Sequence, residues 1–379
     1  MLAVNHQEAD RVPISPKMSS EFIAQQIGKT YWKIGWKDYF ETARAYGYDC
    51  SVYWCLQGNP AGNEGMLLRR RPDNVIQRNL GEFINETRIW ETPRGELYER
   101  LEIPNDPRKR EDNPDEFGLI KEFLVKEEKD LEALPYCFRD PTHIDVAECE
   151  AIRLWVGENS VIEALGPDAL HNAVVSRGLE QIIYDVFERP EWLREMLRIY
   201  QKAALRRTEV MLDRLKEADI IFTTGCNTTE SIWSPKHWEV WFAPLVAEQT
   251  RLIREGGKVH HYFVDGKMMG HLRKVKEMHI GIFSSLEPPD TADGDLRIAK
   301  QMIGDVVCLW GNVDPIYVLL MGDQVKIETA VKEAIDAAAV GGGFILGTGE
   351  VVARNTPSAN LRAFVEAGKR YGSYVVKSG

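Results

Sequence analysis

Residues 306–346, VVCLWGNVDPIYVLLMGDQVKIETAVKEAIDAAAVGGGFIL, contain two short apolar runs separated by a longer amphipathic stretch. The runs at 306–310 and 343–346 have the length of buried strands, and 324–339 has the periodicity of a helix with one apolar face. Strand, helix and strand in this order predict two parallel strands joined by a crossover helix.

The same alternation extends through the C-terminal two thirds of the chain, and it is typical of a parallel sheet, either open and doubly wound or closed into an eight-stranded barrel. The residues alone leave both options open. The other predicted strands are 48–56, 161–165, 218–223, 258–264 and 280–286, and the other predicted helices are 179–200 running on through 215, 235–254, 295–302 and 357–371.

An insertion at 64–138, rich in charge and proline, separates the first predicted strand from the second. Within it, RIWETPRGELYERLEI (88–103) predicts a hairpin that turns at Pro93, Arg94 and Gly95. Since no Ser/Gly-rich linker is present, we expect a β-rich elaboration of one domain that spans residues 1–379.

The composition excludes several classes of protein. The 379 residues are 44% hydrophobic and 28% charged, as in globular proteins, and the net charge of -11 argues against binding to nucleic acid or to a membrane surface. The N-terminus, MLAVNHQEADRVP, lacks the basic and apolar regions of a signal peptide, so we expect a cytoplasmic protein. The six cysteines are scattered without a CxxC pair, which indicates reduced thiols.

Polar residues follow most of the predicted strands, where a barrel enzyme carries its catalytic groups. Helix capping is the competing explanation for each of them. The candidates are Glu163, Asn227 and Glu230 in TTGCNTTES (223–231), Asp265 in VDG (264–266), Glu287 in SLEPPD (285–290), and Glu350 in GTGE (347–350).

The densest group of candidates is KVHHYFVDG (258–266). Alternation along a strand puts His261, Phe263 and Asp265 on one face and His260 and Tyr262 on the other. His261 and Asp265 are compatible with two metal ligands or with a buried hydrogen-bonded pair, and the residues alone favour the pair. Nucleotide-binding and dinucleotide-binding glycine motifs are absent from the sequence.

Several blocks of sequence together resemble the uroporphyrinogen decarboxylase superfamily. They are ADRVPI (9–14), GNVDP (311–315), GGGFILGTG (341–349) and NTPSANLRAFVEAGKRYG (355–372). The resemblance implies an α/β fold, a (β/α)8 TIM barrel with its site at the carboxyl ends of the strands. The decarboxylases' arginine-rich segment is missing from 17–32, and TPRGEL (92–97) is similar to a segment of the corrinoid-dependent methyltransferase branch.

That branch implies a methyltransferase that moves a methyl group from a small methylated compound to the Co(I) of a corrinoid protein. A methoxylated aromatic is the favoured substrate, which makes the reaction an O-demethylation. Because the cobalamin fingerprint D-x-H-x-x-G is absent, we expect a separate corrinoid protein to supply the cobalamin. The oligomeric state stays open, with a homodimer as one option.

The branch also implies zinc, but its His and two Cys ligands fall on Phe263, Asp265 and Glu350. An oxygen-rich and imidazole-rich site suits a harder Lewis acid that binds an ether oxygen. The expected Zn²⁺ ligands are His261, Asp265 and Glu350, or a competing set with His260 and Glu239. Asp265 and Glu350 are the expected catalytic residues, and the expected substrate contacts are Glu163, Asn227, Glu230 and Glu287.

Three alternatives remain open. A decarboxylase acting on a polycarboxylate would require an arginine cluster, which the strand ends do not supply. A barrel that has lost its chemistry would serve as a binding module. A methyl transfer without metal would use Glu350 as the general acid toward the leaving oxygen.

Overall fold

The computed structural model describes residues 1–54, 67–78, 81–104, 119–138, 144 and 146–374. The chain divides into two compact units. The expectation of a single domain over 1–379 stays a prediction, because this division does not say whether either unit folds alone. Unit 1 comprises Met1–Trp54, Val146–Leu165 and Leu215–Gly379, and unit 2 comprises Cys55–Asp145 and Gly166–Arg214.

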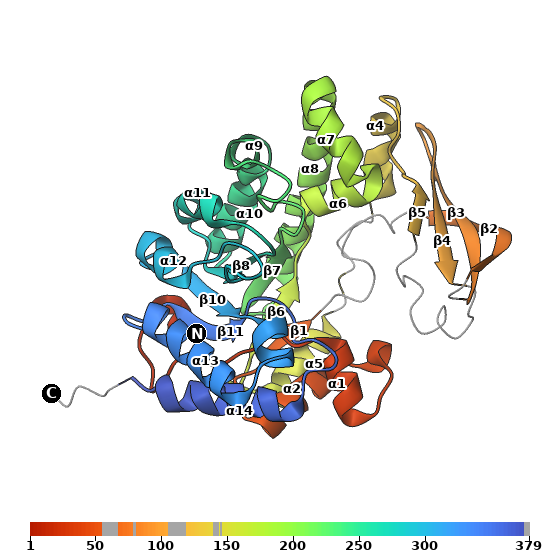
Figure 1. Ribbon diagram of the computed structural model, residues 1–379. Coiled ribbons are helices and arrows are strands. Elements are labelled where there is room, and N and C mark those ends of the chain that lie inside the picture. Colours follow the sequence, from red (N-terminus) through yellow and green to blue (C-terminus); the bar gives the residue numbers. More distant parts are fainter. Residues whose placement is uncertain (55–66, 79–80, 105–118, 139–143, 145, 375–379) are drawn as a thin grey trace. The chain divides into compact units, whose positions relative to one another are not determined.

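Unit 1 contains, within the described residues, a curled sheet of seven parallel strands with helices along its outer side (Figure 1). The order across the sheet is also the order along the chain, β1-β6-β7-β8-β9-β10-β11. The predicted strands are confirmed as β1 (Ser51–Trp54), β6 (Val161–Leu165), β7 (Ile220–Thr224), β8 (Val259–Val264), β9 (Ile282–Ser285), β10 (Cys308–Val313) and β11 (Phe344–Thr348).

The strand ladder described for unit 1 does not close into a complete barrel. Residues 13–15 lie between β11 and the start of β1: the Leu346 N–H donates to the Pro13 carbonyl at 2.9 Å, and the Asp49 N–H donates to the Ile14 carbonyl at 2.7 Å. Within the described residues, this segment pairs with β11 through an isolated parallel bridge between Ile14 and Leu346. The α/β class is confirmed as a curled half-barrel of the TIM-barrel type.

The interior of the curled sheet is layered along the strand direction. An apolar layer near the amino ends includes Ile220, Ile282 and Ile345, which pack with Ala3 from the N-terminus. Since successive side chains alternate between faces, the interior residue that follows Ile282 is Ser284. The interior therefore changes from apolar to polar toward the carboxyl ends of the strands.

Helices cover the outer face of this sheet in Figure 1. The predicted helix 235–254 is divided in two at Phe242, because Pro244 has no N–H to continue the helical hydrogen bonds. A π-helical turn occupies Pro315–Leu320. The helices of unit 1 are α1 (Ser20–Ile27), α2 (Trp36–Tyr46), α5 (Ala147–Val156), α9 (Pro235–Trp241), α10 (Ala243–Glu255), α11 (Leu272–Met278), α12 (Leu296–Ile303), α13 (Gln324–Ala338) and α14 (Ser358–Tyr371).

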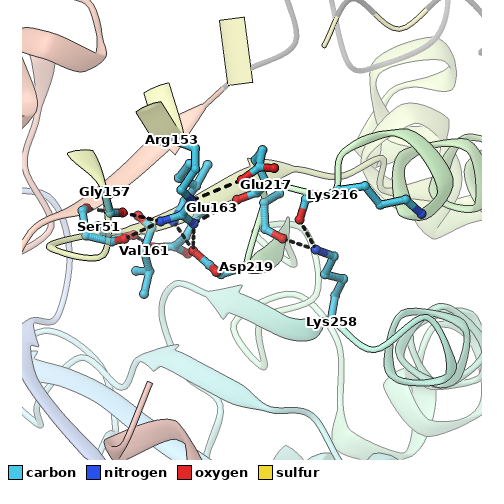
Figure 2. A network of polar contacts seen from close by, with 12 residues as sticks. Ser51, Arg153, Gly157, Val161, Glu163, Lys216, Glu217, Asp219 and Lys258 are labelled. Atoms are coloured by element: carbon cyan, nitrogen blue, oxygen red, sulfur yellow. Dashed lines mark hydrogen bonds and ion pairs between the residues drawn. The ribbon is translucent and has the colours of Figure 1, made fainter. Parts of the chain in front are cut away.

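A polar network ties α5 to the amino ends of β6 and β7 (Figure 2). Arg153 of α5 donates to the Asp219 carboxylate at 2.5 Å and to the Gly157 carbonyl at 2.8 Å. The same carboxylate accepts the backbone N–H of Ile162 at 2.8 Å. These contacts lie at the end of the sheet opposite the carboxyl ends, so we assign them a structural role.

Unit 2 contains the predicted insertion, and its described strands form an antiparallel sheet in the order β2-β3-β4-β5. Thr92 pairs with Gly95, which confirms the hairpin and places Pro93 and Arg94 at its turn. The strands are β2 (Leu67–Arg78), β3 (Gly81–Thr92), β4 (Gly95–Pro104) and β5 (Leu119–Glu122).

The helices of unit 2 pack around a buried ion pair. Arg177 donates to the Asp185 carboxylate at 2.8 Å and to the Lys126 carbonyl at 2.9 Å. No helix in the described part of the chain is long and apolar enough to cross a membrane. The helices are α4 (Asp130–Ala133), α6 (Ala169–Arg177), α7 (Leu179–Glu188) and α8 (Pro190–Arg214).

Candidate active site

A cavity of about 530 Å³ opens at the carboxyl ends of the strands of unit 1. This is the end at which barrel enzymes carry their sites, as the sequence predicted. Its walls combine aromatic rings with charged and hydroxyl groups. The aromatic residues are Tyr39, Tyr48, Tyr53, Phe222, Phe263 and Trp310, and the polar ones include Lys17, Ser51, Glu163, Cys226, His261, Asp265, Ser284, Ser285 and Glu350.

Lys17 places an ammonium group in this cavity. Its Nζ lies 3.4 Å from Oε1 of Glu350 and 3.0 Å from the centroid of the Phe263 ring. The backbone of Lys17 is held at the end of β11, where its N–H donates to Oγ1 of Thr348 at 3.1 Å. Burial lowers the pKa of Lys17, while the charge of Glu350 opposes that shift.

Asp265 lies beside this ammonium at the end of β8. Burial is the main cause that raises the pKa of Asp265, and the charge of Glu350 adds to it. Lys17 and a hydrogen bond from Cys226 act in the opposite direction. Oδ1 of Asp265 is buried without a hydrogen-bond partner. A buried carboxyl oxygen with unused capacity is a group that a ligand in the cavity can engage.

His261 and Glu163, both candidates from the sequence, form a hydrogen-bonded pair deeper in the cavity. Nδ1 of His261 lies 2.6 Å from Oε2 of Glu163, and its Nε2 lies 2.6 Å from Oγ of Ser284. Ser51 donates to the other oxygen of Glu163. Both ring nitrogens of His261 and both oxygens of Glu163 therefore have partners within the protein.

The competing metal ligands lie elsewhere. His260 is fully buried on the opposite face of β8, with its ring nitrogens 2.8 Å from Oγ1 of Thr223 and 2.8 Å from Oγ1 of Thr250. Glu239 on α9 pairs with exposed Arg273 at 3.0 Å. No group of three or more His, Cys, Asp or Glu side chains that could hold a metal was found among the described residues.

The remaining candidates for substrate contact mainly hold loops. Glu230 accepts the Gly270 N–H at 2.5 Å, and Glu287 accepts the Gly266 N–H at 2.7 Å. The backbone carbonyl of Asn227 accepts the indole N–H of Trp233 at 2.8 Å. Burial raises the pKa of both Glu230 and Glu287. None of these three residues lines the cavity in the described structure.

Lys17 and Ser284 are the site residues that the sequence analysis missed. Lys17 is the third residue after the ADRVPI block (9–14), a segment that the sequence does not mark as a strand. Ser284 lies two residues after Ile282 on β9, so strand alternation could have placed it in the interior.

Comparison with protein families places most of unit 1 in one group. Residues 161–371 match the family described as Uroporphyrinogen decarboxylase (URO-D), which is more than half of the chain. The chain belongs to the uroporphyrinogen decarboxylase family. This confirms the resemblance that the sequence blocks suggested.

One protein of known sequence and two solved structures are similar to this chain to different degrees. A uroporphyrinogen decarboxylase from Trichodesmium erythraeum (strain IMS101) is 28% identical over 145 residues, which cover 37% of this chain and only 38% of that protein. A methyltransferase from Methanosarcina mazei has the same fold, with a TM-score of 0.65 and 15% identity over 98% of this chain and 97% of that one. A D-psicose 3-epimerase structure with D-fructose reaches a TM-score of only 0.36, with 10% identity over 65% of this chain and 92% of that one.

The positions at which the resemblance to the methyltransferase branch implies zinc ligands lie around Lys17. Phe263, Asp265 and Glu350 all interact with the ammonium of Lys17. A protein cation therefore lies where the resemblance would place a metal, and Phe263 offers no ligand atom. The described residues therefore do not fit a zinc ion.

Proposed function

We propose that this protein is a methyltransferase that transfers a methyl group from a small methylated compound to the Co(I) of a separate corrinoid protein. A methoxylated aromatic is the favoured donor. The observation that carries the proposal is the cluster of Lys17, Asp265 and Glu350 on the wall of an aromatic-lined cavity. The fold shared with the Methanosarcina mazei methyltransferase supports it.

The chemistry requires a proton at the leaving oxygen. Attack of Co(I) on the methyl carbon breaks the C–O bond, whose electron pair stays on the oxygen. The methyl group becomes bonded to cobalt, formally Co(III), and the oxygen takes a proton to give the phenol. A phenol is a far better leaving group than a phenolate, so a positioned acid accelerates this step.

Lys17 and Asp265 are suited to supply that proton. Burial lowers the pKa of the Lys17 ammonium, which makes it a stronger acid, and burial raises the pKa of the Asp265 carboxyl, which favours its protonated form. Both shifts are directed toward neutral pH, where a general acid is most effective. Glu350 accepts a hydrogen bond from Lys17 and fixes the position of its Nζ.

The cavity suits an aromatic donor in size and lining. A volume of about 530 Å³ falls within the range of small-molecule sites. The rings of Tyr53 and Phe222 pack edge to face, with their centroids 5.3 Å apart. Such rings offer a flat apolar surface against which an aryl group can pack.

Cobalt methylation tests the proposal. Purified protein is mixed with a corrinoid reduced to Co(I) and a panel of methoxylated aromatics, and formation of methyl-cobalt is followed by absorbance. We expect Lys17→Met to lower the rate about 100-fold, since a general acid contributes at least that much. The control is Glu239→Gln, which removes a carboxylate on the surface of α9.

Two results would contradict the proposal. Absence of methyl-cobalt with every donor, including methylated amines and thiols, would exclude the methyl transfer. An unchanged rate in Lys17→Met would retain the transfer and exclude the ammonium as its acid. Elemental analysis of the same preparation tests the zinc expectation, and we expect far less than one zinc per chain.

The family membership and the Trichodesmium erythraeum relative favour decarboxylation as the second candidate. Several cations are needed to hold a substrate with many carboxylates. Among the described residues that line the cavity, Lys17 supplies a positive charge and no arginine is present. We therefore rank decarboxylation below methyl transfer.

A further inference from the structure

Three side chains from three strands form a continuous hydrogen-bonded chain inside the cavity. Ser284 comes from β9, His261 from β8 and Glu163 from β6. Oγ of Ser284 lies 2.6 Å from Nε2 of His261, whose Nδ1 lies 2.6 Å from Oε2 of Glu163. A hydroxyl, an imidazole that can take its proton, and a carboxylate that orients the imidazole are the parts of an activated nucleophile.

The partners of Glu163 are compatible with one tautomer of a neutral His261. An ionised carboxylate only accepts, and Glu163 has Ser51 at one oxygen and Nδ1 of His261 at the other. With the proton on Nδ1, Nε2 of His261 is an acceptor for the Ser284 hydroxyl. This is the tautomer that removes a proton from a serine hydroxyl.

Aromatic packing holds the imidazole in that orientation. Trp310 stacks on the His261 ring at a centroid distance of 5.0 Å and an interplanar angle of 21°. Phe222 meets the same ring edge-on, with centroids 4.8 Å apart. The His261 residue is only 4% exposed. The alignment is present before any substrate enters, which reduces the cost of reaching the reactive geometry.

His260, the next residue on the same strand, supplies an internal comparison. Its two ring nitrogens meet the hydroxyls of Thr223 and Thr250 and no carboxylate. Desolvation lowers the pKa of His260 to about 3, so that imidazole is a poor base. Full burial between two hydroxyl groups is typical of a histidine with a structural role. His261 differs from His260 because one of its ring nitrogens has a carboxylate partner.

A cation lies on the same face of the sheet as this serine. Ser284 pairs in register with Phe263 of the neighbouring strand, and Nζ of Lys17 lies 3.0 Å from the centroid of the Phe263 ring. Side chains of register partners in a parallel sheet are on the same face. Both residues line the cavity, where the charge of Lys17 favours negative charge that develops on a bound carbonyl oxygen.

We propose that Ser284 is a nucleophile that accepts the acyl group of a small carboxylic ester, with His261 as its general base and Glu163 as the residue that orients His261. Oγ of Ser284 bonds to the carbonyl carbon while its proton passes to Nε2 of His261. The bond from carbon to the alcohol oxygen then breaks, and His261 returns the proton to that oxygen. A water molecule then gives a proton to Nε2 of His261 and its oxygen bonds to the acyl carbon. The bond from that carbon to Oγ of Ser284 breaks, the carboxylic acid leaves, and His261 returns the proton to Oγ.

A fluorophosphonate probe tests this assignment without a methyl donor or a corrinoid, so its outcome is separate from that of the proposed methyl transfer. We expect the full chain to gain one phosphonyl adduct, located by peptide mass spectrometry on Ser284 and absent in Ser284→Ala. His261→Gln is expected to slow labelling about 100-fold, because the base is lost. Hydrolysis of 4-nitrophenyl acetate is expected to fall in parallel.

The matched control is Thr250→Val, which removes a hydroxyl that bonds to the other histidine, His260. We expect this variant to be labelled at the wild-type rate. Glu163→Gln keeps the size of the side chain and is expected to slow labelling less than His261→Gln. Absence of an adduct in the folded wild-type protein, an adduct on another residue, or equal labelling of Ser284→Ala would overturn the proposal.

Discussion

His260 and His261 show at the scale of single residues how strand alternation gives neighbouring side chains different surroundings. His261 faces the cavity and pairs with a carboxylate, whereas His260 faces α10 and meets two threonine hydroxyls. The sequence analysis predicted these opposite faces. The sequence analysis favoured a buried hydrogen-bonded pair of His261 and Asp265, and this prediction was wrong. His261 bonds instead to Glu163, which comes from another strand.

The buried neutral ring of His260 predicts an acid-dependent loss of stability. Its pKa is lowered to about 3, against 6.5 in the unfolded chain, so the unfolded state binds more protons between these values. Stability is therefore lost as the pH falls below 6.5, by roughly 1.4 kcal/mol per pH unit for one such group. We expect urea titrations across this window to show a shallower pH dependence for His260→Gln.

The control for that experiment is His279→Asn at the exposed end of α11. His279 has a left-handed backbone that asparagine tolerates. We expect His279→Asn to keep the slope of the wild-type protein, and an unchanged slope in His260→Gln would contradict the assignment.

The contribution of Asp265 to stability is expected to depend on pH in the opposite direction to that of His260. Burial raises its pKa above 3.8, so the folded state favours the protonated carboxyl. That contribution to stability is present below pH 3.8 and is lost as the pH rises through the raised pKa. Asparagine resembles the protonated form, so Asp265→Asn should gain stability relative to the wild type as the pH rises from acidic to neutral.

Asp305 provides the comparison for this prediction. A hydrogen bond from Lys276 lowers the pKa of Asp305, so Asp305→Asn should lose stability relative to the wild type over the same rise in pH. Equal pH profiles for Asp265→Asn and the wild type, measured by urea unfolding, would show that burial of Asp265 has no energetic effect.

Lys17 could not be predicted from local sequence, because nothing in KMSSEF distinguishes a buried ammonium from a surface lysine. Its position depends on pairing between the N-terminal segment and β11, which is a contact between distant parts of the chain. Asn227, Glu230 and Glu287 were predicted from their place after strands. The structure gives them the loop-holding contacts that such residues often make.

At the scale of elements, the alternation of apolar runs and amphipathic stretches was sufficient to predict the strands of unit 1. The helix ends are less predictable, because the sequence pattern predicts one continuous helix over 179–215 and another over 235–254. The structure divides them at Pro190 and before Pro244, where proline cannot donate the hydrogen bond of a helix interior. Periodicity continues across such breaks, so it does not reveal them.

Breaking the hydrogen bonds of Arg153 at the amino ends of the strands is expected to lower the stability of the fold without changing the reaction rate. Arg153→Met removes the donor to Asp219 and to the Gly157 carbonyl while keeping much of the side-chain volume. We expect the free energy of unfolding to fall by about 1–3 kcal/mol, since a half-buried carboxylate loses its partner.

The rate of cobalt methylation checks the second half of that prediction. Arg153 does not line the cavity, so folded Arg153→Met should transfer methyl groups at the wild-type rate. A lower rate at a temperature where the variant is fully folded would mean that the amino ends of the strands take part in the reaction.

At the scale of the whole molecule, the two compact units predict unfolding that is not two-state. If each unit unfolds cooperatively by itself, scanning calorimetry should give an enthalpy larger than the van 't Hoff value. Arg153→Met should shift the transition of unit 1, and Arg177→Met, which breaks the buried pair with Asp185, should shift the transition of unit 2. A single two-state transition moved equally by both changes would contradict this expectation.

The ion pair between Lys17 and Glu350 joins positions 333 residues apart. Contacts of such long sequence separation carry a high cost in chain entropy, which is met only when the segment around Lys17 lies beside β11. The ammonium in the cavity therefore depends on the docking of this segment rather than on the pairing of β6 to β9. A change that loosens the segment can remove the charge from the cavity while the neighbouring strands stay paired.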